Sequence, residues 1–293
     1  MPRILVIGGT GMLGHKLVQQ LSDRFDIYTT IRGDFSTVER FGIFDEAKTI
    51  SQTRLEDECS VRHAIGRSKP DVVINAAGII KQLPASSDVI ATLTINSILP
   101  RRLYQLSAEH GYRLILISTD CVFSGQKGNY TESDEPDAKD LYGRSKLLGE
   151  VIADRCLTIR TSFIGRELET SHGLVEWFLS NRGKKVKGFA RAIYSGFPTV
   201  VFADIMANLL VEHPDLDGLY HISSDPIDKC RLLSLVSREY KANIGLDPDE
   251  SLVIDRSLDS TRFRTATGFA PPPWEEMVGQ MAADPTPYDE WRK

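Results

Sequence analysis

The sequence predicts an α/β fold built on a doubly wound parallel sheet. Short apolar, β-branched runs alternate with helical patterns through the first half of the chain, as in successive βαβ units. Two of these runs, Val72–Ile74 and Leu114–Ile117, are apolar at every position. Continuous apolar character is typical of parallel strands that helices cover on both faces.

The expected elements follow one another in a regular order. Strands are predicted over Arg3–Ile7, Asp26–Ile31, Asp71–Asn75, Arg113–Ser118 and Cys156–Thr161. Helices are predicted between them, over Leu13–Leu21, Asp57–Ser68, Asn96–His110 and Tyr142–Asp154. Because each helix connects two strands, we expect one parallel sheet with helices on both faces.

The alternation ends at about residue 165. Helical stretches near Gly173–Leu179 and Val201–Leu210 follow, and a late strand over Leu219–Ile222 could return to the main sheet. The tail is rich in proline and is predicted to be irregular but packed through Trp274 and Trp291. We therefore expect a main domain over 1–165 and a smaller lobe over 166–293, with some strands of the lobe in the main sheet.

Composition excludes several classes of function. The 293 residues are 41% hydrophobic and 26% charged, and the net charge of −5 argues against nucleic acid or anionic membranes as general partners. The N-terminal apolar run is short and ends in glycines, which indicates a strand and not a signal peptide. No apolar run approaches the length of a membrane-spanning helix. Four scattered cysteines favour a cytoplasmic protein with reduced thiols and no metal site; they are Cys59, Cys121, Cys156 and Cys230.

A glycine triplet directly follows the first strand and precedes the first helix. Gly8, Gly11 and Gly14 have the spacing of a turn that cradles a pyrophosphate, which needs close backbone amides and the positive end of a helix dipole. The strand-turn-helix context makes this a Rossmann-type dinucleotide site. Thr10, Met12 and Leu13 complete the expected turn.

The end of the second strand indicates which dinucleotide binds. An NAD site places Asp or Glu there to hold the ribose hydroxyls, whereas this chain has Arg32. A guanidinium matches a 2′-phosphate by charge and by its planar geometry. NADPH is the favoured cofactor, and Asp34 keeps NADH as the alternative.

Tyr142 and Lys146 are four residues apart and therefore lie on one face of the predicted helix. A cation beside a phenol favours the phenolate and lowers the pKa of the tyrosine from its usual value near 10. Tyr142 can then act as a general acid toward a carbonyl oxygen while hydride arrives at the carbon. Thr119 follows the strand Arg113–Ser118, and its hydroxyl could stabilise the developing oxyanion; the alternative role is a turn cap.

Four segments together resemble the extended short-chain dehydrogenases/reductases, and within them the dTDP-4-dehydrorhamnose reductase-like group. The segments are Gly8–Gly14, Asn75–Gly78, Ser118–Phe123 and Tyr142–Glu150. The resemblance implies catalytic roles for Thr119, Tyr142 and Lys146. It implies a cofactor site that adds Leu55, Asn75, Ala76, Ala77, Gly78, Asn96, Ser118, Tyr142 and Lys146 to the glycine turn and Arg32. It also implies a substrate site made of Thr119, Asp120, Cys121, Val122 and Arg256.

The chain departs from the family pattern at positions that would read the sugar. Related dehydratases carry a glutamate where this chain has Cys121, and a thiol cannot replace that carboxylate, so dehydration is disfavoured. Ile193 and Tyr194 stand where the family has Asp-Gln, and Ser257 stands where it has a proline. The segment Ile79–Leu83 replaces the family's Tyr-Thr-x-Val-Asp stretch. A different sugar nucleotide, for instance a UDP-linked 2-acetamido sugar, is therefore compatible with the sequence.

The expected function is an NADPH-dependent oxidoreductase of deoxysugar biosynthesis. By the resemblance, it reduces the C4 ketone of a nucleotide-linked 6-deoxy-4-ketohexose. Two alternatives stay open: a non-catalytic NADP-binding subunit similar to the β subunit of methionine adenosyltransferase, and a nucleotide-sugar C4 epimerase. The expected partner is the nucleotide sugar, and a homodimer is compatible with the sequence.

Overall fold

The computed structural model describes residues 1–81 and 84–292, which form two compact units. The first unit comprises Met1–Ser118, Asp140–Ile159 and Ala203–Leu219. The second comprises Thr119–Lys139, Arg160–Phe202 and Tyr220–Lys293. The chain therefore passes between the units several times.

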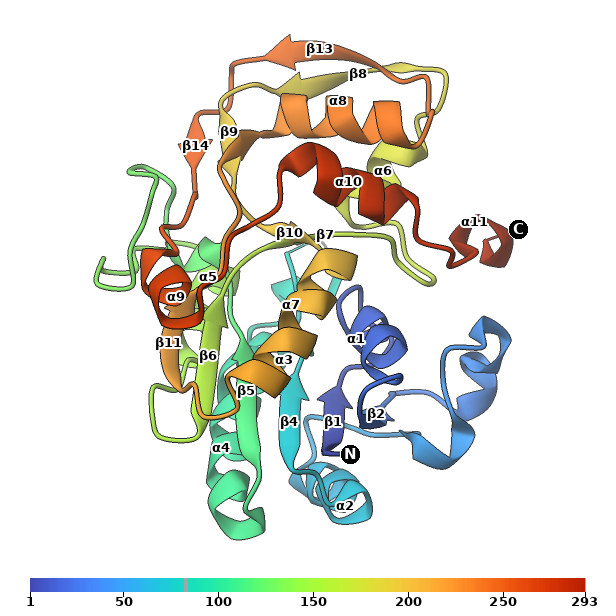
Figure 1. The fold of residues 1–293 in the computed structure, drawn as a ribbon, viewed down its shortest axis with the longest axis vertical. Helices are drawn as coiled ribbons and strands as arrows, with labels where there is room; N and C mark the ends of the chain where they lie inside the picture. The colour runs from blue at the N-terminus through green and yellow to red at the C-terminus, as the bar shows by residue number, and fades with distance from the viewer. Residues whose placement is uncertain (82–83, 293) are drawn as a thin grey trace. The chain divides into compact units, whose positions relative to one another are not determined.

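A seven-stranded sheet runs through the first unit in the order β11-β6-β5-β4-β1-β2-β3 (Figure 1). Its strands are β1 (Arg3–Ile7), β2 (Asp26–Thr30), β3 (Thr49–Ile50), β4 (Val72–Asn75), β5 (Arg113–Ile117), β6 (Cys156–Arg160) and β11 (Gly218–His221). Neighbouring strands from β6 to β3 are parallel. From β1 the chain adds β2 and β3 on one side and then β4, β5 and β6 on the other, so the direction of winding reverses at β1. The doubly wound Rossmann class is therefore confirmed.

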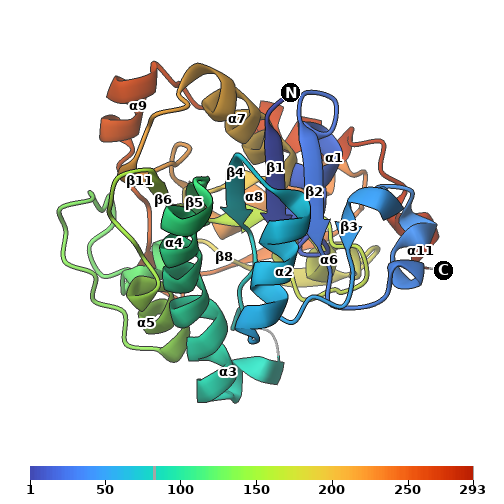
Figure 2. The same cartoon turned by 90° about the horizontal axis from the view of Figure 1, so that it is seen from below.

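Helices cover both faces of this sheet (Figure 2). α1 (Gly14–Leu21) and α7 (Thr199–Glu212) lie on one side of the strands, and α2 (Glu58–Ser68) and α4 (Leu99–His110) lie on the other. α1 and α7 are neighbours, because the Gln20 amide donates to Asp204 at 3.3 Å. The predicted arrangement of helices is therefore present.

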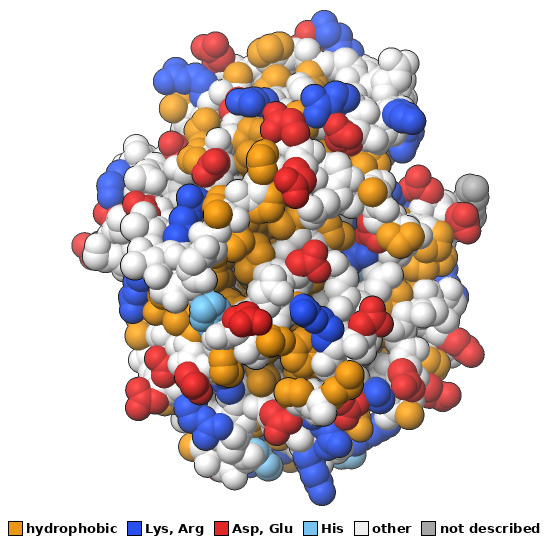
Figure 3. Space-filling model, viewed as in Figure 1, with side chains coloured by type: hydrophobic (Ala, Val, Ile, Leu, Met, Phe, Trp, Pro, Cys, Tyr) orange, Lys and Arg blue, Asp and Glu red, His pale blue; other side chains and the backbone are white. Residues whose placement is uncertain are grey.

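Charges of both signs are mixed on the surface. Lys and Arg side chains are interspersed with Asp and Glu side chains over the face shown in Figure 3. Some form ion pairs, such as Lys48 with Asp26 at 2.9 Å and Arg62 with Glu109 at 2.6 Å. Among the described residues, no helix combines the length and apolar character needed to cross a bilayer.

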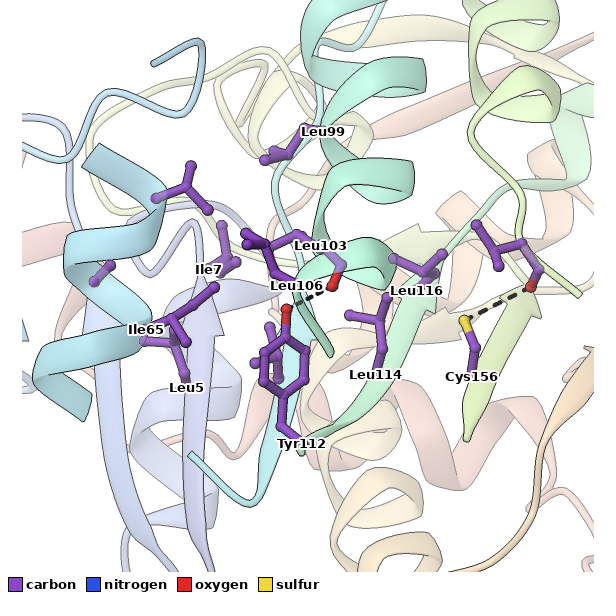
Figure 4. Packing of buried hydrophobic residues seen from close by; sticks show 14 of the residues in the cluster. Leu5, Ile7, Ile65, Leu99, Leu103, Leu106, Tyr112, Leu114, Leu116 and Cys156 are labelled. Atoms are coloured by element: carbon purple, nitrogen blue, oxygen red, sulfur yellow. Dashed lines mark hydrogen bonds between the residues drawn. The ribbon is translucent and has the colours of Figure 1, made fainter. Parts of the chain in front are cut away.

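Apolar side chains fill the space between the sheet and the helices α2 and α4 (Figure 4). Leu5 of β1 and Leu114 of β5 point toward Ile65 of α2 and Leu103 of α4, and all four are buried. Alternate residues of each strand share a face, which is why every second apolar residue enters this cluster. The buried Tyr112 hydroxyl donates to the Leu103 carbonyl at 2.5 Å, so its polar group is satisfied.

Two predicted helices have different bounds in the structure. The helix expected over Tyr142–Asp154 is α5 (Leu141–Leu148) and ends six residues earlier. A Cβ at Gly149 would lie 2.0 Å from the Asn96 carbonyl oxygen, so the chain reaches a close backbone approach there and turns away. The helix expected from Asn96 instead begins with α3 (Val89–Leu93), which Asp88 caps, and continues through a π-helical segment, Thr94–Ile98, into α4.

The second unit contains three small sheets, β10-β7, β12-β9-β14 and β13-β8, and several helices. Its strands are β7 (Phe163–Ile164), β8 (Lys185–Phe189), β9 (Ala192–Tyr194), β10 (Phe197–Pro198), β12 (Ile227–Asp228), β13 (Gly245–Asp249) and β14 (Ile254–Asp255). Its helices are α6 (Leu174–Leu179), α8 (Lys229–Glu239), α9 (Thr261–Thr267), α10 (Trp274–Ala282) and α11 (Tyr288–Trp291).

The prediction of an irregular tail was wrong. Pro273 is the residue before α10, a position that proline tolerates because its fixed φ suits the entry to a helix. Trp274 is buried as expected, and its indole donates to the Asp225 carbonyl at 2.7 Å. The expected late strand is β11, which joins the main sheet beside β6.

Candidate active site

The turn between β1 and α1 has the geometry that the glycine triplet predicts. Gly8 has φ +85°, a conformation that side chains with a Cβ rarely adopt. A Cβ at Gly14 would lie 2.0 Å from the Gly8 carbonyl oxygen, so only glycine lets α1 start this close to the turn. The Gly11 amide donates to the same carbonyl at 3.1 Å. The turn is therefore closed by its own backbone.

The N-terminus of α1 has no side-chain cap. Thr10 and Gly11 are exposed, Met12 is half-buried, and Leu13 is buried under the turn. The first amides of a helix lack partners within the helix and carry partial positive charge, which favours a bound phosphate. The predicted pyrophosphate site is therefore exposed at Thr10 and Gly11, and the first backbone amides of α1 give it partial positive charge.

Arg32 extends into solvent just beyond β2. Its side chain is 84% exposed, and its guanidinium contacts Glu56 at 3.3 Å. Arg54 contacts the same carboxylate at 3.5 Å, so two guanidinium groups meet at Glu56. Asp34 accepts a hydrogen bond from the Gln52 amide. Two arginine side chains thus lie beyond the end of β2, where the sequence predicts the 2′-phosphate site, and the Asp34 carboxylate bonds to Gln52.

The end of β4 lies against the glycine turn. Asn75 is buried, and its side-chain oxygen accepts from the Ala77 amide at 3.2 Å. The Ala76 amide donates to the Ile7 carbonyl, and a Cβ at Gly8 would touch Ala77 at 3.0 Å. The two strand ends therefore form one wall of the predicted cofactor site. Leu55 is half-buried against the apolar cluster.

Asn96 organises the next part of the site. Its buried side chain bonds both backbone groups of Ile79 at 2.9 Å and donates to the Ser145 hydroxyl at 3.1 Å. Ser145 in turn donates to the Tyr142 carbonyl at 2.8 Å. A Cβ at Gly78 would lie 3.4 Å from the Asn96 oxygen. Asn96 thus fixes the loop after β4 to the helix α5.

Tyr142 and Lys146 lie on one face of α5, as the sequence predicts. Asp140 caps the helix by accepting from the Gly143 amide at 3.0 Å. The Lys146 ammonium donates to the Ile117 carbonyl at 2.7 Å, at the carboxyl end of β5. Burial lowers the pKa of Lys146 to about 8, and the charge of Glu150 opposes this shift. The lysine is held toward the strand end where ligands bind in such sheets.

Ser118 and Glu150 form a polar pair near Lys146. The Ser118 hydroxyl donates to the Glu150 carboxylate at 2.6 Å. From the sequence, Glu150 was only the last residue of the Tyr142–Glu150 motif, with no role of its own. Its negative charge favours the ammonium form of Lys146, so it is a candidate for tuning the site.

Replacing Glu150 by glutamine should move the basic limb of kcat/KM to lower pH by about half a unit to one unit. The charge that raises the pKa of Lys146 is lost, so the ammonium gives up its proton at lower pH. A pH profile from neutral to alkaline conditions measures this, with Glu150→Asp as the charge-retaining control. An unchanged basic limb would show that Glu150 does not act on Lys146.

The segment Thr119–Val122 belongs to the second unit and forms a short 3₁₀ turn after β5. The Thr119 hydroxyl accepts from the Cys121 amide at 3.1 Å and donates to Asp120 at 3.2 Å, which is the capping role. Asp120 is buried, and burial raises its pKa while Arg256 opposes the shift. Cys121 is partly exposed, whereas Val122 is fully buried and its carbonyl accepts from the Ala138 amide at 3.0 Å.

Arg256 is also in the second unit. Its guanidinium Nε donates to the Phe123 carbonyl at 2.8 Å, and its side chain is half-buried. The structure therefore gathers Arg256 with Thr119–Val122 in the second unit. It gathers the predicted cofactor residues and the pair Tyr142 and Lys146 in the first unit.

Other features bear on what the site can hold. The described residues contain no group of three or more His, Cys, Asp or Glu side chains suited to a metal ion. Within the segment Ile79–Leu83, Gln82 and Leu83 lie outside the described residues. Lys81 of that segment lies beside Tyr142, a contact that the sequence reasoning missed because Lys81 is distant from α5 along the chain.

The chain is similar to known proteins over most of its length. Residues 2–239 match the family model described as the RmlD substrate binding domain. The chain is 28% identical over 300 residues to the spore coat polysaccharide biosynthesis protein SpsK of Bacillus subtilis, covering 95% of this chain and 96% of that protein. It is 25% identical over 309 residues to the dTDP-4-dehydrorhamnose reductase of Aggregatibacter actinomycetemcomitans, covering 97% and 99%.

A solved structure shares the fold. It is the dTDP-4-dehydrorhamnose reductase of Bacillus anthracis in complex with NADP, with a TM-score of 0.79 and 21% identity. The match covers 97% of this chain and 99% of that chain. The likeness therefore extends over both compact units.

Proposed function

Since the chain belongs to the RmlD substrate-binding-domain family, which residues 2–239 match, we propose that it is an NADPH-dependent sugar-nucleotide reductase. It reduces the C4 ketone of a nucleotide-linked 6-deoxy-4-ketohexose to an alcohol. The observation that carries this proposal is the pair Tyr142 and Lys146 on one face of α5, with the ammonium of Lys146 held at the carboxyl end of β5. The relatives named as reductases support the same reaction class.

The residues present fit NADPH. The Gly8–Gly14 turn brings backbone close to the uncapped start of α1, and the Gly14 position has no room for a Cβ. Arg32 supplies a guanidinium for the 2′-phosphate. The residues from Asn75 to Gly78, at the end of β4, would lie along the cofactor. Bound NADPH would supply the hydride.

The side chains supply the proton and the orientation. Tyr142 donates the phenolic proton to the carbonyl oxygen, so that ketone, hydride and proton give the alcohol. The Lys146 ammonium stabilises the phenolate left behind. Within the second unit, the Thr119 hydroxyl is the proposed hydrogen-bond donor to the substrate. Asp120, Cys121 and Arg256 of the same unit are the other proposed substrate contacts, whereas the buried side chain of Val122 would support this segment from beneath.

Incubation with NADPH and a panel of dTDP- and UDP-linked 4-keto-6-deoxy sugars tests the proposal. NADPH absorbance should fall, and the product should carry a hydroxyl at C4. A non-catalytic subunit would instead bind NADP(H) without consuming it and co-purify with a larger enzyme. A C4 epimerase would retain tightly bound NAD and interconvert products without net loss of NADPH.

Replacing Arg32 by alanine should weaken NADPH binding by about 10- to 100-fold and leave NADH binding nearly unchanged. The loss of one charge-assisted phosphate contact is worth about 1.5–3 kcal/mol. Titration of each cofactor by fluorescence measures both affinities. Equal losses for NADPH and NADH would show that Arg32 does not read the 2′-phosphate.

The chain is also proposed to act in the cytoplasm as a homodimer. Within the described residues, none of its four cysteines forms a disulfide, which suits a reducing compartment. Exposed apolar side chains on and near α3 and α5 support self-association; they are Val89, Ile90, Ile98, Leu148 and Ile152. Sedimentation velocity of the wild type and of Ile90→Lys tests the dimer, which the substitution should weaken.

A further inference from the structure

Lys81 lies beside the start of the helix that carries Tyr142. Its ammonium is 2.9 Å from the Asp140 carboxylate and 5.7 Å from the centroid of the Tyr142 ring. Asp140 is the residue that caps α5. Lys81 therefore contacts both the cap of the helix and the ring that the helix presents.

We propose that Lys81 is a positioning residue for Tyr142, whose ammonium holds the phenol ring and the helix cap in place and stabilises the phenolate. This role rests on the proposed reductase function, because it concerns the same acid. It goes beyond that function because Lys146 is otherwise the cation assigned to Tyr142. Lys81 lies on the loop after β4, whereas Lys146 lies on α5 itself.

The described residues of the first unit include several charged groups on α5 and on the elements that pack against it; among them are Arg144 of α5 and Arg101 of α4, which donates to the Leu148 carbonyl at 2.7 Å. Lys146 and Asp140 belong to α5 and its cap, Lys81 comes from the loop after β4, and Glu150 acts on Lys146. The segments α3 and Thr94–Ile98 pack against α5 and contain no titratable side chain between Val89 and Ile98. Asp140 is paired with Lys81, so its negative charge is offset where it would otherwise oppose a phenolate.

A purely structural ion pair predicts a different outcome. The two side chains are 38% and 42% exposed, and pairs with such exposure contribute little to stability. A cation over a ring and near a phenol instead acts on the ionisation of that phenol. The two roles therefore separate in a titration of Tyr142, which needs no substrate.

The test is an ultraviolet titration of tyrosinate in the intact protein with bound NADP⁺. Subtracting the curve of Tyr142→Phe isolates the Tyr142 step. Burial raises the pKa values of Tyr112, Tyr194, Tyr240 and Tyr288, which keeps these four phenols out of the same range. For Lys81→Met, the curve to subtract is that of the double variant Lys81→Met/Tyr142→Phe. The Tyr142 step of Lys81→Met should move to higher pH by about 0.5 to 1 unit.

Two controls separate charge from packing and from global stability. Lys81→Arg keeps the cation and should return the Tyr142 step close to its wild-type position. Lys48→Met removes a lysine of similar exposure, 41%, that pairs with Asp26 at the same 2.9 Å near the amino end of β2, and it should shift nothing. The same shift in Lys48→Met, or an unshifted Tyr142 step in Lys81→Met, overturns the proposal.

Activity separates this inference from the function on which it rests. If Lys81→Met shifts the Tyr142 step but the wild type reduces none of the keto sugars, the proposed reaction fails and the role of Lys81 stands. If the wild type is active and Lys81→Met shows no shift, the reaction stands and the role of Lys81 fails. With both correct, Lys81→Met should lower kcat more than it changes KM.

Discussion

Replacing Tyr142 by phenylalanine should lower kcat by about 10²- to 10⁴-fold while NADPH affinity stays close to that of the wild type. The substitution removes only the hydroxyl that donates the proton. The ring, its helix and the Ser145 contact to the Tyr142 backbone are all retained. Steady-state kinetics on the keto sugar that the wild type reduces, together with a cofactor titration, measure both quantities.

Tyr104→Phe is the matched control for this substitution. Tyr104 is likewise half-buried on a helix, α4, and packs against the apolar cluster. Its hydroxyl has no part in the proposed chemistry, so kcat should stay near the wild-type value. A Tyr142→Phe protein with near-normal turnover would show that another group supplies the proton.

Replacing Gly14 by alanine should destabilise the fold by about 1–3 kcal/mol and weaken NADPH binding at least tenfold, or about 1.4 kcal/mol. The added Cβ would lie 2.0 Å from the Gly8 carbonyl oxygen and 3.1 Å from the Gly9 Cα. Both neighbours are backbone atoms, so either α1 or the phosphate-binding turn must move. Chemical denaturation and cofactor titration measure the two effects.

Gly66→Ala is the control for the Gly14 substitution. Gly66 is inside α2, and a Cβ there would meet nothing within 4 Å. Alanine should therefore stabilise the protein by about 0.5–1 kcal/mol and leave NADPH binding unchanged. If Gly14→Ala behaved like Gly66→Ala, the close approach at the turn would not exist in solution.

The main sheet could be predicted because its determinants are local. The strands β1, β4 and β5 are largely apolar runs, and the Gly8–Gly14 spacing marks the turn that precedes α1. The two-residue strand β3 was not predicted, because so short a run shows no periodicity. The pair Tyr142 and Lys146 could be placed on one helix face from their spacing alone. Helix ends were less predictable, because α5 ends where Gly149 meets the carbonyl of Asn96, which is distant in sequence.

The elements of the second unit were mostly missed for the same reason. Strands such as β7 and β10 have only two residues each and pair with partners far along the chain, so no periodicity marks them. Lys81 beside Tyr142 and Glu150 beside Ser118 are also long-range contacts. The roles of the predicted site residues, and the division between a cofactor-binding part over 1–165 and a substrate-binding part over 166–293, stay predictions.

Transfer of deuterium from NADPH that carries deuterium at both C4 positions, [4,4-²H₂]NADPH, to the sugar tests the central claim most directly. The wild-type protein would be incubated with the labelled cofactor and the dTDP- and UDP-linked 4-keto-6-deoxy sugars, and the products analysed by mass spectrometry and NMR. The account predicts deuterium at C4 of the product alcohol, with stoichiometric oxidation of the cofactor. Cofactor that binds but keeps its deuterium with every sugar would contradict it.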